Sequence, residues 1–208
     1  MNKKERVIKI IQIFDEAYGN ADCTLDFTTP LELLIATQLA AQCTDARVNI
    51  VTKDLFAKYK SVEDFANADL KELEQDVKST GFFRNKAKNI ISCCQRLISE
   101  YNGEVPNNLD DLLTLAGVGR KTANLVLGDI FGIPGVVVDT HATRISNLLD
   151  LAKHSDPYKI ELDLQKCVPR ERWGKFCRQM VFHGREYCIA RRPQCNVCPI
   201  SELCPSKK

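Results

Sequence analysis

Four cysteines near the C-terminus are the clearest candidates for chemistry. They follow the pattern C-x6-C-x2-C-x5-C and are Cys188, Cys195, Cys198 and Cys204. Four thiolates within 17 residues can ligate one zinc ion tetrahedrally, and they can equally hold an iron–sulfur cluster. The spacing leaves both open, because structural zinc sites more often have two short C-x2-C pairs and this segment has one. A redox dithiol is disfavoured because the βαβ context is missing.

Two arginines, Arg191 and Arg192, lie in the loop between the first two of these cysteines. A loop closed by a metal site is ordered before it meets a ligand, so less entropy is lost when it grips a phosphate. We therefore expect a clamp on a nucleic-acid backbone, while an ordinary solvated basic face also fits.

A glycine-rich turn, Gly117-Val118-Gly119, separates two segments with helical patterning. Glycine permits tight backbone turns and close approach to a ligand, and the helix that follows offers free N–H groups to an anion. The sequence GVGRKT is not a P-loop, because the four-residue interval and the preceding strand are missing. A hairpin whose glycines only make a corner remains an alternative.

Two residues near this turn could perform catalysis. Lys121 lies in the first turn of the second helix, where the helix dipole and Arg120 disfavour the ammonium form. A free amine is what a Schiff-base nucleophile requires, although an exposed surface lysine is equally compatible. Asp139 precedes the segment THATRISNLL, and it fits a helix N-cap as well as a catalytic carboxylate.

Helix signals recur along the whole chain and predict the elements that position these residues. A helix is expected over residues 7–17, and Ser61 with Asp64 forms a weak capping box. The only β-branched run, residues 136–138, is too short for a sheet, so we predict an all-α fold. Further helices are expected in LELLIATQLAAQ after Thr29-Pro30, DARVNIVTKDLFAKY after Thr44, NKAKNIISCCQRLISEY after Gly81 and LDDLLTLA after Asn108.

Composition and charge restrict the class of protein. The chain has 208 residues, no apolar stretch long enough to span a bilayer and no signal-peptide cleavage site, so we expect a cytoplasmic, not a membrane, protein. Residues 1–116 carry 14 Lys and Arg against 18 Asp and Glu, whereas residues 117–208 carry 15 against 9. The basic half predicts a polyanionic partner. The six remaining cysteines are expected to be small buried hydrophobic residues: Cys23, Cys43, Cys93, Cys94, Cys167 and Cys177.

Taken together, these motifs resemble the endonuclease III family of DNA base-excision glycosylases, within the helix-hairpin-helix superfamily. The resemblance covers nearly the whole chain, in the same order and spacing. Four stretches carry it: LIATQLAAQCTD at 34–45, STGFFRNKAKNI at 79–90, LAGVGRKTANLVL through VVVDTHATRISN at 115–147, and HGREYCIARRPQC…C…C at 183–204. Ala116 departs from the family pattern, which has proline at this hairpin position.

The resemblance implies a fold, a cofactor and a partner. It implies a [4Fe–4S] cluster in place of zinc, bound by the four cysteines. It also implies a six-helix barrel domain at 23–133, with the helix-hairpin-helix at about 108–130, and a cluster domain formed by 1–22 and 134–208. Double-stranded DNA containing damaged pyrimidines or abasic sites would lie in the cleft between the two domains. A monomer, nucleoid-associated in a prokaryote, is the expected form.

The resemblance also implies residue roles. Lys121 would attack C1′ of a damaged pyrimidine nucleotide, release the base and permit strand cleavage by β-elimination, and Asp139 would assist it. The target nucleotide must leave the duplex. Gln42 would fill the vacated space and Phe82 would wedge the opposite strand, although Phe82 could instead be core. The amides of Gly117, Val118 and Gly119 would hold phosphate, and further backbone contacts would come from Arg144, Arg191 and Arg192.

Two alternatives stay open at this point. A monofunctional mismatch-specific glycosylase typically lacks the lysine and has an extra C-terminal recognition domain. A non-catalytic DNA-binding iron–sulfur protein would need neither Lys121 nor Asp139. The presence of both residues favours a bifunctional glycosylase and AP lyase that acts on oxidised pyrimidines.

Overall fold

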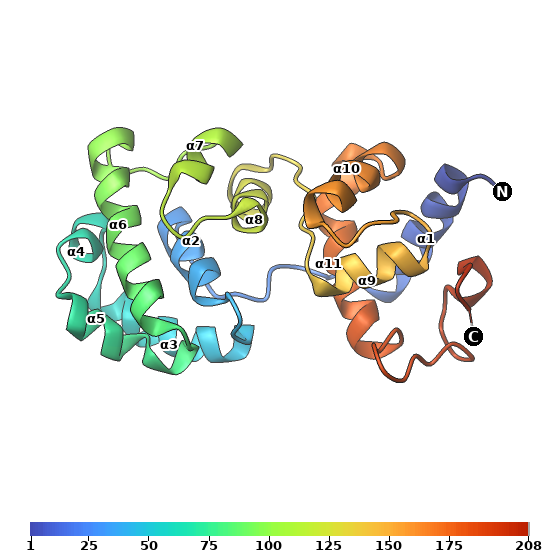
Figure 1. Ribbon diagram of the computed structural model, residues 1–208, viewed down its shortest axis with the longest axis horizontal. Helices are drawn as coiled ribbons and strands as arrows, with labels where there is room; N and C mark the ends of the chain where they lie inside the picture. The colour runs from blue at the N-terminus through green and yellow to red at the C-terminus, as the bar shows by residue number, and fades with distance from the viewer. Residues whose placement is uncertain (208) are drawn as a thin grey trace. The chain divides into compact units, whose positions relative to one another are not determined.

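The computed structural model describes residues 1–207, and within them the chain forms helices and connecting loops without a β-strand (Figure 1). The predicted all-α fold is confirmed. The α-helices are α1 (Lys3–Ala17), α2 (Pro30–Leu39), α3 (Asp45–Lys58), α4 (Val62–Ala66), α5 (Leu70–Asp76), α6 (Phe83–Tyr101), α7 (Leu109–Thr114), α8 (Arg120–Phe131), α9 (Thr140–Leu148), α10 (Pro157–Cys167) and α11 (Trp173–Glu186). Three short 3-10 helices are η1 (Lys78–Thr80), η2 (Arg170–Arg172) and η3 (Ser201–Leu203).

The chain folds into two compact units. The first, which we call the hairpin unit, is Cys23–Gly132, and it contains α2 to α8. Its centre is α2, in which every residue from Leu33 to Leu39 is buried, and α3, α6 and α8 pack against it. A helix that is apolar on all sides must be covered on all sides, which explains this central position.

The second unit, the cysteine-loop unit, joins Met1–Asp22 to the chain from Ile133 onward. The buried stripe of α1, with Val7, Ile10 and Phe14, packs into a core that includes residues of α9, α10 and α11. The valine run does not form a strand, but Val136 and Val138 are buried in this core as extended chain.

Local capping signals explain where most helices begin. Thr29 and Ser61 form complete capping boxes with Glu32 and Asp64, and Thr44 accepts a hydrogen bond from the Arg47 N–H. Such caps satisfy backbone donors that lack partners inside the helix. At Asn108 the side chain accepts from the Asp111 N–H in the same way.

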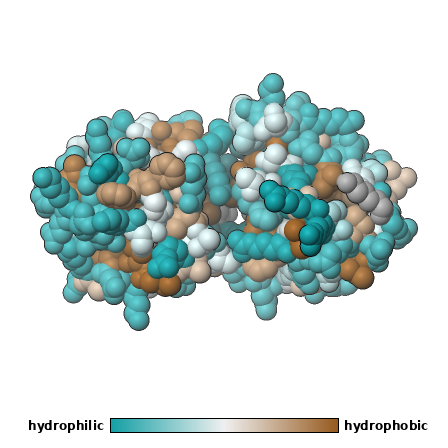
Figure 2. All heavy atoms as spheres, turned by 60° about the horizontal axis from the view of Figure 1, so that its bottom comes forward, coloured by the Kyte–Doolittle hydropathy of each residue, from teal (hydrophilic) through white to brown (hydrophobic). Residues whose placement is uncertain are grey.

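The two largest departures from the sequence expectations concern the end of α2 and the burial of two cysteines. The helical pattern LELLIATQLAAQ continues to residue 42, but α2 ends at Leu39, and Gln42 has a left-handed backbone with φ 55°. Cys23 and Cys43 are only half-buried, unlike the four other cysteines outside the C-terminal cluster. The surface in Figure 2 is mainly hydrophilic, with small separate hydrophobic patches, and none of the helices in residues 1–207 is long and apolar enough to cross a membrane.

Candidate active site and cysteine loop

The hairpin between α7 and α8 requires glycine at position 117. The φ of Gly117 is +75°, a backbone conformation that costs free energy for any residue with a Cβ. A Cβ at this position would lie 2.7 Å from Gln38 Oε1 and 2.9 Å from Asn89 Cβ. The turn can therefore press against α2 and α6 only because residue 117 has no side chain.

The end of this turn leaves space beside the start of α8. Gly119 is the N-cap residue, no side chain caps the helix, and a Cβ on Gly119 would meet no atom within 4 Å. The N–H groups of the first turn therefore face no capping side chain, which suits an anion. Val118 is buried beneath the turn, and Lys121, the second residue of α8, is exposed. An exposed primary amine thus follows directly after a helix start that no side chain caps.

Gln42 and Phe82 are at two loop tips in the hairpin unit, and both have left-handed backbones, with φ 55° and 48°. Phe82 is 65% exposed, so the alternative that it belongs to the core is wrong. Both residues line one cavity of about 190 Å³, together with residues of α2 and α6 and with Gly117. Strained backbone at non-glycine residues is typical of functional sites.

Lys86 lies in the same cavity wall, and the sequence motifs assign it no role of its own. Its side chain is buried, and Nζ donates hydrogen bonds to the carbonyl oxygens of Leu39 and Thr80, each at 2.8 Å. Burial lowers the pKa of this amine. The available signal was its spacing: Lys86 falls on the buried stripe of α6, in register with Ile90 and Leu97.

Asp139 in the cysteine-loop unit is the N-cap of α9, as one of its two interpretations predicts. Its carboxylate accepts a hydrogen bond from the Ala142 N–H at 2.7 Å. The side chain is half-buried. Capping engages one carboxylate oxygen, and a carboxylate has a second oxygen that can accept hydrogen bonds, so a cap and a functional carboxylate are compatible.

The four C-terminal cysteines line one cavity of about 180 Å³. All four are half-buried, and apolar residues such as Ile145 and Leu149 form part of the same wall. Within residues 1–207, no three His, Cys, Asp or Glu side chains converge closely enough to hold a single metal ion. Four soft thiolate donors around a cavity several times the ~30 Å³ share of one water molecule suit a multi-iron cluster.

Hydrogen bonds hold the cysteine loop to the helices around it. The Cys188 N–H donates to the His183 carbonyl at 2.9 Å, and the Gln194 N–H donates to the Tyr187 carbonyl at 2.8 Å. The Arg144 guanidinium donates to the Cys188 carbonyl at 2.7 Å. The sequence did not predict this hydrogen bond for Arg144. The contact of Arg144 with a DNA phosphate stays a prediction.

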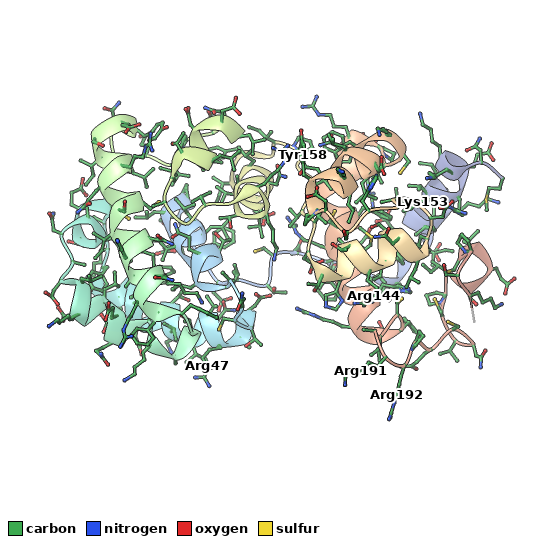
Figure 3. All side chains as sticks on the ribbon, in the orientation of Figure 1. Arg47, Arg144, Lys153, Tyr158, Arg191 and Arg192 are labelled. Carbon is green, nitrogen blue, oxygen red and sulfur yellow. The ribbon has the colours of Figure 1, made fainter. Side chains whose placement is uncertain are left out.

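The residues next to the cysteines differ in exposure: two arginines are exposed and one histidine is buried. Arg191 and Arg192 are exposed and point away from the ribbon at the loop that follows α11 (Figure 3). His183 is buried, its Nε2 lies 3.6 Å from Cys198 Sγ, and its other ring nitrogen lies 3.3 Å from the Tyr18 hydroxyl. Burial lowers the pKa of His183 to about 4, so its ring is neutral at pH 7.

Comparisons with known proteins agree with this arrangement. Residues 35–170 match the family "HhH-GPD superfamily base excision DNA repair protein", and residues 188–204 match the "Iron-sulfur binding domain of endonuclease III". Endonuclease III of Synechocystis sp. is 50% identical over 99% of this chain and 94% of its own length. Endonuclease III of Escherichia coli K12 is 38% identical over 100% of this chain and 98% of its own length.

Two solved structures extend the likeness to three dimensions. A trapped endonuclease III–DNA covalent intermediate has a TM-score of 0.93 and 45% identity, and it covers 100% of this chain and 98% of that chain. A thermostable thymine-DNA glycosylase has a TM-score of 0.85 and 25% sequence identity, and the match covers 98% of this chain and 97% of that chain.

These likenesses, with the cavity lined by four cysteines, establish the cofactor as an iron–sulfur cluster of the [4Fe–4S] type. The partner is DNA. The chain belongs to the endonuclease III family of base-excision DNA repair enzymes, and its activity is that of a DNA N-glycosylase and AP lyase.

Proposed function

We propose that Lys121 is the nucleophile of this enzyme and that its substrates are oxidised pyrimidines and abasic sites in duplex DNA. The exposed amine follows directly after the uncapped turn at Gly119, and this observation carries the proposal. The turn would hold a phosphate through the amides of residues 117–119, which would bring the adjacent sugar toward the amine. Asp139 would assist activation and stabilise positive charge on the sugar.

The chemistry at Lys121 has two stages. The lone pair of Nζ forms a bond to C1′, the bond from C1′ to the base breaks, and the base leaves with a proton. An Nζ proton is then lost, the C1′–O4′ bond breaks as the nitrogen lone pair forms the C=N bond, and O4′ takes up a proton, which gives a Schiff base on the opened sugar. Removal of a C2′ proton breaks the C3′–O bond, which cleaves the strand on the 3′ side. The cysteines would hold the cluster, which when bound closes the C-terminal loop that presents Arg191 and Arg192.

The nucleotide must be extrahelical for this attack to occur. We propose that Gln42 enters the space it leaves and that Phe82 wedges the other strand. Their exposed positions at two loop tips beside one cavity support this assignment. Arg144, Arg191 and Arg192 would contact the DNA backbone, and the enzyme would act as a monomer.

Reductive trapping tests the proposal. The protein is incubated with a duplex that contains thymine glycol or an abasic site, and borohydride is added to reduce any Schiff base. We expect a covalent complex with wild type and none with Lys121→Ala. A wild type that excises the base without a trappable complex would indicate a monofunctional glycosylase. A Lys121→Ala variant that traps as well as wild type would remove Lys121 from the reaction.

A further inference from the structure

Lys86 is a buried cation in a place where the fold alone does not require one. It lies in the first turn of α6, and the residue is 6% exposed. An ammonium in the interior is costly unless its N–H groups are hydrogen-bonded. Its Nζ meets this condition by donating to the carbonyls of Leu39 and Thr80, both at 2.8 Å. A methionine would fill similar space without the cost.

The two carbonyls belong to segments that are distant in the sequence and that both turn sharply. Leu39 is the last residue of α2, and its carbonyl is one of those without a partner inside the helix. Thr80 ends η1. The ammonium group therefore closes both helix ends and joins them through one atom, and the positive charge matches the negative end of the α2 dipole.

Each joined segment leads to a residue with a left-handed backbone. Gln42 follows Leu39 by three residues and Phe82 follows Thr80 by two. Such conformations are strained for residues with a Cβ and persist only where neighbouring structure holds them. The Lys86 N–H also donates to the Phe82 carbonyl at 3.1 Å. Lys86 thus contacts the base of both loops, and all three residues line the cavity of about 190 Å³.

We infer that Lys86 is a positioning residue for nucleotide flipping, because it ties the Gln42 loop to the Phe82 loop and fixes both tips before DNA arrives. This inference rests on the proposed entry of Gln42 and Phe82 into the duplex. A preformed pair of tips loses less entropy when it replaces a base in the stack than two independent loops would lose. Lys86 has no part in the attack of Lys121 on C1′, so its effect is confined to substrates that must be opened.

The test compares a substrate that needs flipping with one that does not. Lys86→Met keeps the side-chain length and removes the donors, and Lys88→Met removes the same charge from an exposed position of the same helix. In single-turnover excision of thymine glycol from a duplex, we expect Lys86→Met to be slower by about tenfold or more, the scale of one or two lost hydrogen bonds. Borohydride trapping on a single-stranded abasic oligonucleotide should change by less than about twofold. Lys88→Met should match wild type in both assays.

A double-mutant cycle with Phe82→Ala tests the route of the effect. Fluorescence of 2-aminopurine beside the lesion reports unstacking directly. If Lys86 acts through the loop tips, the loss in the double variant is smaller than the product of the two single losses. If Phe82→Ala leaves flipping unchanged, the wedge assignment fails and the inference fails with it.

Other outcomes overturn the inference alone. If Phe82→Ala slows flipping but Lys86→Met does not, Lys86 positions nothing. If Lys86→Met lowers the reaction rate equally on the duplex and on the single strand, its role is generally structural. The same conclusion follows if the rate losses of the two single variants multiply in the double variant. If circular dichroism shows that Lys86→Met is partly unfolded, Lys86→Gln takes its place, because the glutamine amide can still donate to one of the two carbonyls. It should show a smaller loss that is again confined to the duplex, and an equal loss on both substrates would contradict the inference.

Discussion

Replacement of Gly117 by alanine should destabilise the hairpin unit by an amount that the structure allows us to divide in two. The φ of +75° costs a residue with a Cβ about 1 kcal/mol relative to glycine. The new Cβ would also lie 2.7 Å from Gln38 Oε1 and 2.9 Å from Asn89 Cβ. Gln38 is only 4% exposed, so it has little room to move, and overpacking of this kind costs about 1–3 kcal/mol. We expect a total loss of about 2–4 kcal/mol.

Gly132 provides the matched control. It has a φ of +64°, it belongs to the same unit, and a Cβ there would meet no atom within 4 Å. Gly132→Ala should therefore cost only the conformational part, about 1 kcal/mol. Urea unfolding followed by circular dichroism measures both variants, while fluorescence of the single tryptophan, Trp173, reports the cysteine-loop unit. If Gly117→Ala costs no more than Gly132→Ala, the close packing of the hairpin on Gln38 is not as described.

Other perturbations should be equally informative. Arg172 donates a hydrogen bond to Asp15 and lowers its pKa from 3.8 to about 2, so the stability that this pair contributes is complete above pH 4 and is lost as the pH falls toward 2. Melting temperatures of wild type and Asp15→Asn should therefore converge over that range, and a constant difference would contradict the assignment. The purified protein should be brown, and Cys198→Ser should lose the visible absorbance, whereas a colourless wild type with stoichiometric zinc would contradict the cluster. Arg191→Ala with Arg192→Ala should weaken binding to every DNA sequence and reduce the salt slope by up to about two, and an unchanged slope would make both residues ordinary surface.

The helix starts could be predicted because their signals are local. Thr29, Thr44, Ser61 and Asn108 each cap a helix through a backbone N–H three residues away, so the sequence contains both partners. The grouping of the four C-terminal cysteines could be predicted for the same reason, because one short stretch of chain brings all four to one cavity.

The end of α2 could not be predicted in this way. The residues after Leu39 are good helix formers, and nothing among them signals a stop. At this end the carbonyl of Leu39 accepts a hydrogen bond from Lys86 Nζ, which is 47 positions away. Arg144 shows the same limitation: the family resemblance implies a phosphate contact for it, whereas its hydrogen bond to the carbonyl of Cys188, 44 positions away, has no signal in the sequence. Roles that depend on distant backbone atoms leave little trace in local patterns.

The most direct measurement for the central claim is the position of the covalent bond to DNA. The borohydride-trapped complex with an abasic duplex is digested with protease and nuclease, and mass spectrometry locates the residue that carries the sugar remnant. We predict one modified site, the Nζ of Lys121. A sugar remnant on another lysine or on the N-terminal amine, with Lys121 unmodified, would contradict the account.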